Sequence, residues 1–190
     1  MGPRGAGINA GGADAGTRVK CALWPARGGS PETAMINNDV LRSIRYMLDL
    51  GEPKIIEIAK LADETLTLER AELQSYLKKD GDEGYAECPD RVLAHFLDGL
   101  VVHFRGRDPA LPLRPVEKRI TNNLVLKKLR VAFELKDLDM AQCFKDAGFP
   151  VTKPELSALF RQPGHKNYRA CGDQMLRNFL KGLTLRLRGG

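Results

Sequence analysis

Apolar residues recur with the period of an α-helix along most of the chain after residue 35. The first such group occupies positions i, i+1, i+4, i+7 and i+8, at Val40, Leu41, Ile44, Met47 and Leu48. This spacing places them on one helical face. The same spacing returns at Val125, Leu126, Leu129, Ala132 and Phe133. No stretch shows the sustained alternation of apolar and polar residues that is typical of a half-buried strand. The pattern therefore predicts an all-α protein.

The periodicity and the turn residues predict two sets of four helices. The first helix of each set begins near Asn37 and near Asn122. The second helices cover about 54–62 and 138–147, the third about 68–79 and 153–162, and the fourth begin at Asp90 and Asp173. Short polar side chains favour the N-cap, so we expect that role for Asn37 or Asn38, for their counterparts, and for Asp90 and Asp173. Thr152 and Glu155 have the spacing of a capping box.

An internal repeat underlies the two sets. The segment 37–45 returns as 122–130, with an offset of 85 residues. Further along, 72–106 aligns with 155–189 at an offset of 83, and thirteen of the thirty-five positions are identical. Repeats of this kind mark a duplicated structural unit. We therefore predict a tandem repeat of two similar helical units, each of about four helices.

The repeat divides the chain into four segments. Residues 35–106 form the first unit and residues 120–190 the second unit. Between them, residues 107–119 form a linker whose prolines at 109, 112 and 115 exclude a helix. Residues 1–34 are rich in Gly and Ala, and they are either a disordered tail or the product of a misassigned start, with Met35 as the true first residue.

The chain from residue 35 resembles a known family. The motifs are the openings 36–42 and 122–130, the segment Pro163-Gly164-His165-Lys166-Asn167-Tyr168, and Phe179-Leu180 followed by Gly182-Leu183. These motifs are similar to those of the YehS-like bacterial proteins, and the resemblance covers nearly all of 35–190. It implies a cytoplasmic bacterial protein of tandem units. The function of that family is unknown, so the resemblance transfers no catalytic or binding residue.

Composition narrows the class of protein. The chain has 190 residues, 43% apolar and 28% charged, as in an ordinary soluble domain. No apolar run approaches the ~20 residues that cross a bilayer, so we expect no membrane partner. Four Cys without a paired Cys-x-x-Cys motif predict no metal site, and no cofactor motif is found. We therefore favour a binding protein over an enzyme.

Two equivalent cysteines, Cys88 and Cys171, each lie two residues before a predicted N-cap aspartate. A thiolate near a helix N-terminus can have a lowered pKa. However, no His accompanies both copies: His95 aligns with Asn178, and His165 aligns with Asp82. Buried small side chains are the preferred interpretation.

Charge separates the two halves of the chain. Residues 35–106 carry nine basic and fourteen acidic residues, a net −5, whereas 107–190 carry seventeen and eight, a net +9. This asymmetry favours an anionic partner for the basic half, or attraction between the acidic and basic units, within one chain or between chains. The candidate contacts to nucleic acid are Lys127, Lys128, Arg130, Lys166, Arg169 and Arg177.

The segment 144–161 also offers a helix–turn–helix-like element, although its span is longer than that of the compact motif. Two ordinary packed helices remain the alternative interpretation. The order of preference is then a non-catalytic protein-interaction or adaptor protein, followed by a nucleic-acid-binding protein that uses the basic second unit.

Aligned positions in the two predicted fourth helices have opposite charge. Asp98 of the first unit aligns with Lys181 of the second unit. Duplicated units often pack through equivalent surfaces, where identical charges would repel. We therefore expect the regions around Asp98 and Lys181 to lie at or near an interface between units, within a chain or between chains.

Overall fold

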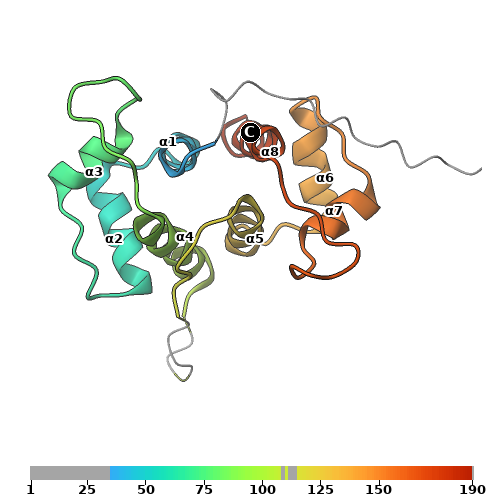
Figure 1. Ribbon diagram of the computed structural model, residues 1–190, viewed down its shortest axis with the longest axis horizontal. Coiled ribbons are helices and arrows are strands. Elements are labelled where there is room, and N and C mark those ends of the chain that lie inside the picture. Colours follow the sequence, from blue (N-terminus) through green and yellow to red (C-terminus); the bar gives the residue numbers. More distant parts are fainter. Residues whose placement is uncertain (1–34, 108–109, 111–114, 190) are drawn as a thin grey trace, which may run out of the picture. The chain divides into compact units, whose positions relative to one another are not determined.

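The computed structural model describes residues 35–107, 110 and 115–189, and within these residues it contains eight α-helices and no β-strand (Figure 1). The first unit consists of α1 (Asn37–Leu48), α2 (Glu52–Ala62), α3 (Arg70–Leu77) and α4 (Asp90–Arg105). The second unit consists of α5 (Asn122–Ala132), α6 (Asp137–Asp146), α7 (Lys153–Leu159) and α8 (Asp173–Arg188). This confirms the predicted all-α tandem of two four-helix units. The predicted tail 1–34 and residues 108–109 and 111–114 of the predicted linker 107–119 lie outside the described residues.

Helix boundaries differ from the expected ones by a few residues. Helices α3 and α7 end at Leu77 and Leu159, two and three residues before the sequence prediction. Helix α2 begins earlier than expected, at Glu52, because Pro53 is accepted in the first helical turn, where its missing N–H has no intrahelical partner. The capping box of Thr152 and Glu155 is present at the start of α7, with the Glu155 N–H bonded to the Thr152 side chain.

The prediction of asparagine N-caps is wrong. The N-cap of α1 is Ile36 and that of α5 is Thr121, so the paired asparagines lie inside the first helical turn. Their side chains bind another part of the unit instead. Asn38 donates to the carbonyls of Tyr76 and Ala86 at 2.9 and 2.8 Å and accepts from the Cys88 N–H at 2.9 Å. The asparagine amide therefore joins α1 to the end of α3 and to the loop between α3 and α4.

Asp90 and Asp173 are not N-caps either, because Pro89 and Gly172 occupy those positions. Each aspartate is the first residue of its helix, where its charge favours the positive end of the helix dipole. Each also accepts a 2.7 Å hydrogen bond from an asparagine, Asn37 in the first unit and Asn122 in the second unit. The sequence Asn-Asn thus fixes the start of the first helix against the start of the fourth helix in both units.

A glycine in each fourth helix allows close packing against the second helix of the same unit. A Cβ atom on Gly99 would lie 1.8 Å from the carbonyl oxygen of Ile58 in α2. A Cβ atom on Gly182 would lie 1.8 Å from the carbonyl oxygen of Cys143 in α6. No side chain fits at either position, so both glycines let the helix backbones touch.

The two units contact each other through two helix pairs. Helix α4 packs against α5, and α1 packs beside α8, as their places in Figure 1 also show. Buried apolar residues from both units form one continuous core, which includes Phe96, Phe144 and Phe179. Within the described residues, no helix is long and apolar enough to cross a membrane. The two helix pairs form the junctions between the units, and they are the basis of the site described next.

Candidate functional site

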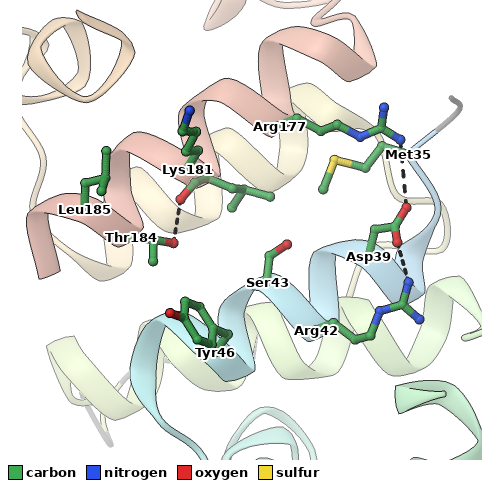
Figure 2. A pocket seen from close by; sticks show the side chains of 10 residues that line it. Met35, Asp39, Arg42, Ser43, Tyr46, Arg177, Lys181, Thr184 and Leu185 are labelled. Atoms are coloured by element: carbon green, nitrogen blue, oxygen red, sulfur yellow. Dashed lines mark hydrogen bonds and ion pairs between the residues drawn. The ribbon is translucent and has the colours of Figure 1, made fainter. Parts of the chain in front are cut away.

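The junction between α1 and α8 contains an open groove with a volume of about 570 Å³ (Figure 2). This volume is in the range of small-molecule and peptide side-chain pockets, roughly 300–1,000 Å³. Both units contribute to its walls. The lining residues are Met35, Asp39, Arg42, Ser43, Tyr46, Arg177, Leu180, Lys181, Thr184 and Leu185. We call this feature the α1/α8 groove.

The wall from α1 is formed by one face of that helix. Arg42, Ser43 and Tyr46 follow Asp39 by three, four and seven residues, so the four side chains lie along one side of the helix. The adjacent face carries the apolar residues of the sequence pattern, and all of them except Leu48 are buried. Tyr46 lies at the C-terminal end of this wall and is 63% exposed. The groove therefore uses the side of α1 next to its buried face.

The wall from α8 is also formed by residues at helical spacing along one side of the helix. Arg177, Lys181 and Leu185 recur at intervals of four residues, and Leu180 and Thr184 lie beside them. Figure 2 shows Arg177 facing Asp39 of α1 across the same end of the groove. At the other end, the Arg188 guanidinium lies 4.3 Å from the centre of the Tyr46 ring. Because Asp39 and Tyr46 follow the same order as Arg177 and Arg188, the two helices run side by side in the same direction.

Charge in the groove is mostly positive. Arg42, Arg177 and Lys181 are basic, and Asp39 is the one acidic residue among the lining side chains. The Asp39 carboxylate accepts from Arg42 at 2.5 Å and lies 4.0 Å from a guanidinium nitrogen of Arg177. Lys181 is exposed and has no ion-pair partner in the part of the chain that the structure describes. The groove therefore combines apolar and hydroxyl groups with a net positive charge.

The junction between α4 and α5 is the repeat counterpart of this groove, and an ion pair closes it. Asp98 of α4 binds Lys128 of α5 there, and both side chains are mostly buried. In the α1/α8 groove the aligned positions are Lys181 and Ser43. The α1/α8 groove has Lys181 at the position of Asp98 and Ser43 at the position of Lys128, so it has no complementary ion pair at these two positions. The two junctions have the same origin, but one of them carries an unneutralised cation.

The predicted interface residues Asp98 and Lys181 therefore lie in different junctions. Asp98 belongs to the first unit and contacts Lys128 of the second unit. Lys181 belongs to the second unit and lines the groove opposite α1. Each residue is placed where the two units meet within the chain, and no ion pair joins them to each other among the described residues.

The six predicted nucleic-acid contacts are divided among three places. Lys128 pairs with Asp98, and Arg177 lines the α1/α8 groove. The other four lie on α5 and on the loop between α7 and α8. These are Lys127, Arg130, Lys166 and Arg169. The structure therefore does not bring all six together, because a helix points successive residues to different sides.

The four remaining basic residues lie along one side of α5 or in the loop that binds it. Asn123 of α5 donates to the Arg169 carbonyl at 2.9 Å, and Lys127 follows Asn123 by one helical turn. The Arg130 guanidinium lies 4.6 Å from the centre of the Phe160 ring and donates to Asp137 at 2.8 Å. With the exposed Arg161 in the same loop, these residues form what we call the basic strip: Lys127, Arg130, Arg161, Lys166 and Arg169.

The predicted helix–turn–helix-like element corresponds to α6 and α7. Helix α7 has seven residues, and its apolar residues Leu156 and Leu159 are buried. Its outer face carries no more than two helical turns of side chains. Recognition of DNA by this element stays a prediction.

The repeated cysteines are buried. Residues Cys88 and Cys171 are 3% and 6% exposed, and burial raises the pKa of each thiol to about 12. Burial also raises the pKa of Cys143. The alternative of a lowered thiol pKa is therefore wrong for Cys88 and Cys171. Within the described part of the chain, no group of three or more His, Cys, Asp or Glu side chains is positioned to hold a metal ion.

Sequence reasoning missed the groove residues of α1: Asp39, Arg42, Ser43 and Tyr46. The available signal was the alignment of two pairs of positions. Asp98 and Lys181 were compared, but Lys128 and its counterpart Ser43 were not. Comparing both pairs shows that one junction keeps a complementary ion pair and the other loses it.

Comparison with known proteins agrees with this architecture. The fold and the repeated junctions define an all-helical protein built from two duplicated four-helix units. The family model described as a protein of unknown function (DUF1456) matches residues 37–106 and again 122–189. The chain belongs to this family. It is 45% identical over 152 residues to the uncharacterized protein YehS of Escherichia coli strain K12, covering 80% of this chain and 96% of that relative. No solved structure matches.

Proposed function

We propose that the protein is a non-catalytic binding protein that holds an acidic, amphipathic segment of a partner protein in the α1/α8 groove. The observation that carries this proposal is the difference between the two repeated junctions. One is closed by Asp98 and Lys128, whereas the other presents Lys181 opposite Ser43 in an open groove. A charge without its complement at a concave site favours a partner of opposite charge.

The shape of the groove supports a helical segment as the partner. Two parallel helices border it, and a helix laid between them would present side chains at i, i+3 and i+4 to both walls. Met35, Leu180 and Leu185 supply apolar contact surface, and Ser43 and Thr184 supply hydroxyl groups. Arg177 and Lys181 supply positive charge. The partner segment would therefore carry apolar residues on one face and acidic residues beside them.

Binding of labelled peptides tests this proposal. The probes are a fluorescein-labelled amphipathic peptide with leucines on one face and glutamates flanking them, and the same peptide with lysine replacing each glutamate. We expect the acidic peptide to bind and the basic one to fail. Lys181→Glu should weaken binding roughly five- to tenfold, because an attractive exposed contact becomes a repulsive one. Lys145→Glu, an equal charge reversal on α6 outside the groove, should change affinity little.

Two results would contradict the proposal. The first is equal weakening by Lys181→Glu and Lys145→Glu, which would show a non-specific charge effect. The second is binding of inorganic phosphate at the groove without binding of the acidic peptide, which would make it a site for small anions.

A nucleic-acid-binding function is the second candidate, and the basic strip favours it. Five basic residues lie along α5 and the loop between α7 and α8, where the aligned loop of the first unit carries Asp80, Asp82 and Glu83. A labelled DNA duplex, used as a further probe in the binding experiment described above, tests this second function. Loss of duplex binding in Lys166→Glu but not in Lys181→Glu, with affinity falling steeply as salt rises, would support this function. Duplex binding that is absent at low salt would exclude it.

We also propose a cytoplasmic location. Cys88, Cys143 and Cys171 are free and buried, and thiols of this kind are typical of a reducing compartment.

A further inference from the structure

Asp39 occupies an unusual place in the α1/α8 groove. It is the one carboxylate among the lining residues, and it lies between two guanidinium groups. Its contact with Arg42 is short, 2.5 Å, whereas its contact with Arg177 is long, 4.0 Å. The Asp39 side chain is 30% exposed, so it can be reached from the groove. A carboxylate of the protein itself therefore stands where an acidic group of a partner would bind.

The repeat shows that the fold does not require this carboxylate. The aligned residue is Leu124 of α5, the helix that packs against α4 in the closed junction. The aligned residue of Arg177 is Ala94, so the second junction lacks both members of the pair. The Asp39 and Arg177 pair is thus a feature of the open groove alone.

The geometry on α8 indicates how many acidic groups the groove accepts. Arg177 and Lys181 are four residues apart on one helical face, roughly 6 Å from each other. Two acidic side chains one helical turn apart on a partner helix have the same separation. One would meet Lys181, which has no ion-pair partner in the described residues. The other would meet Arg177, where Asp39 already lies.

We infer that Asp39 is a resident competitor that occupies the second anion position of the groove and thereby sets its affinity for partners. The inference rests on the proposed function. A partner with two acidic side chains one turn apart displaces Asp39 from Arg177, while Asp39 keeps its short contact with Arg42. A partner with one acidic side chain pairs with Lys181 and leaves Asp39 in place. The groove therefore selects segments with the double acidic pattern.

Neutralising Asp39 tests the inference. The probe is an amphipathic peptide with two glutamates four residues apart, and its comparison peptide has glutamine in place of the second glutamate. Asp39→Asn should bind the two-glutamate peptide roughly two- to fivefold more tightly than the unchanged protein, the gain expected when an exposed competing ion pair is removed. The one-glutamate peptide should bind both proteins alike. Glu64→Gln, an equal charge change at an exposed residue outside the groove, should leave both affinities unchanged.

A second variant guards against misfolding. Asp39→Leu copies the residue that the second unit has at this position, and it should reproduce the gain of Asp39→Asn. Weaker binding in both variants would overturn the inference, because Asp39 would then be needed to position the arginines. An equal gain for Glu64→Gln would overturn it as well, as an effect of net charge alone. If the two-glutamate peptide binds none of the proteins, the proposed function itself fails together with the inference.

Discussion

At the scale of single residues, the repeated asparagines Asn38 and Asn123 do most to join the parts of each unit. Each side chain makes three hydrogen bonds to the backbone, two as donor and one as acceptor, at the end of the third helix and in the loop that follows it. Asn123 also accepts a hydrogen bond from the Tyr168 hydroxyl. An amide at these positions satisfies three backbone groups that would otherwise lack partners. The sequence showed that the asparagines repeat. It did not show their role, because an asparagine near a helix start is equally typical of an N-cap and of a bridge to a distant loop.

The buried thiols give a prediction at this scale. Because the pKa of Cys88 and of Cys171 is raised to about 12, both remain protonated at pH 8 in the folded protein. In a Cys21→Ala variant, we expect a thiol reagent at pH 8 to react more than about tenfold more slowly than after unfolding in guanidinium chloride.

The pH dependence of stability has a definite sign for these groups. A pKa raised on folding means that the folded state favours the protonated thiol. The contribution is fully present below the ordinary pKa of 9.0 and is lost as pH rises from there toward about 12. In the thiol-reagent experiment at pH 8, reaction of the folded protein as fast as that of the unfolded protein would contradict the burial of Cys88 and Cys171.

At the scale of elements, each unit depends on backbone contact between its second and fourth helices. Gly99 and Gly182 are identical in the repeat alignment, and each lies against a carbonyl group of the second helix of its unit. The apolar periodicity predicted the four helices per unit because a helix buried on one face must show it. Helix ends were predicted less well. The last turns of α3 and α7 accept hydrogen bonds from Asn38 and Asn123, and these asparagines are far from them in the sequence.

Substitution of one of these glycines should destabilise the protein. Gly182→Ala places a methyl group 1.8 Å from the Cys143 carbonyl oxygen, so α6 and α8 must separate. We expect a loss of about 1–3 kcal/mol in the free energy of unfolding, measured by denaturant titration. Gly172→Ala, at the start of the same helix, meets nothing within 4 Å and should have a much smaller effect. Equal losses in the two variants would show that close packing at Gly182 is not the cause.

At the scale of the whole molecule, the two junctions show how a duplicated fold gains an asymmetric site. The α4/α5 junction keeps an ion pair, and its end is closed by Arg105 with Glu134. The α1/α8 junction is closed at one end by Arg188 over Tyr46 but is open between its walls. The sequence shows that the two units have opposite net charge, and in the structure these charges form ion pairs between the units of one chain. Asp39 of the acidic unit meets Arg177 of the basic unit, and Asp98 meets Lys128.

The sequence predicted part of the candidate site and could not predict the rest. Lys181 and Arg177 were both singled out, but each was assigned to a different role. The groove depends on which faces of α1 and α8 are opposed, and helical periodicity alone does not state which helices of two units are neighbours. Ser43 and Thr184 carry no charge and match no motif, so only their place in the groove distinguishes them.

The most direct measurement of the central claim is a map of backbone amide chemical shifts by ¹⁵N–¹H NMR during titration with the acidic amphipathic peptide. We expect the largest saturable shifts on both walls of the α1/α8 groove, including Ser43 of α1 and Lys181 and Thr184 of α8. The closed α4/α5 junction around Asp98 and Lys128 should change little. Shifts confined to the basic strip around Lys166, or the absence of saturable shifts along α1, would contradict the account.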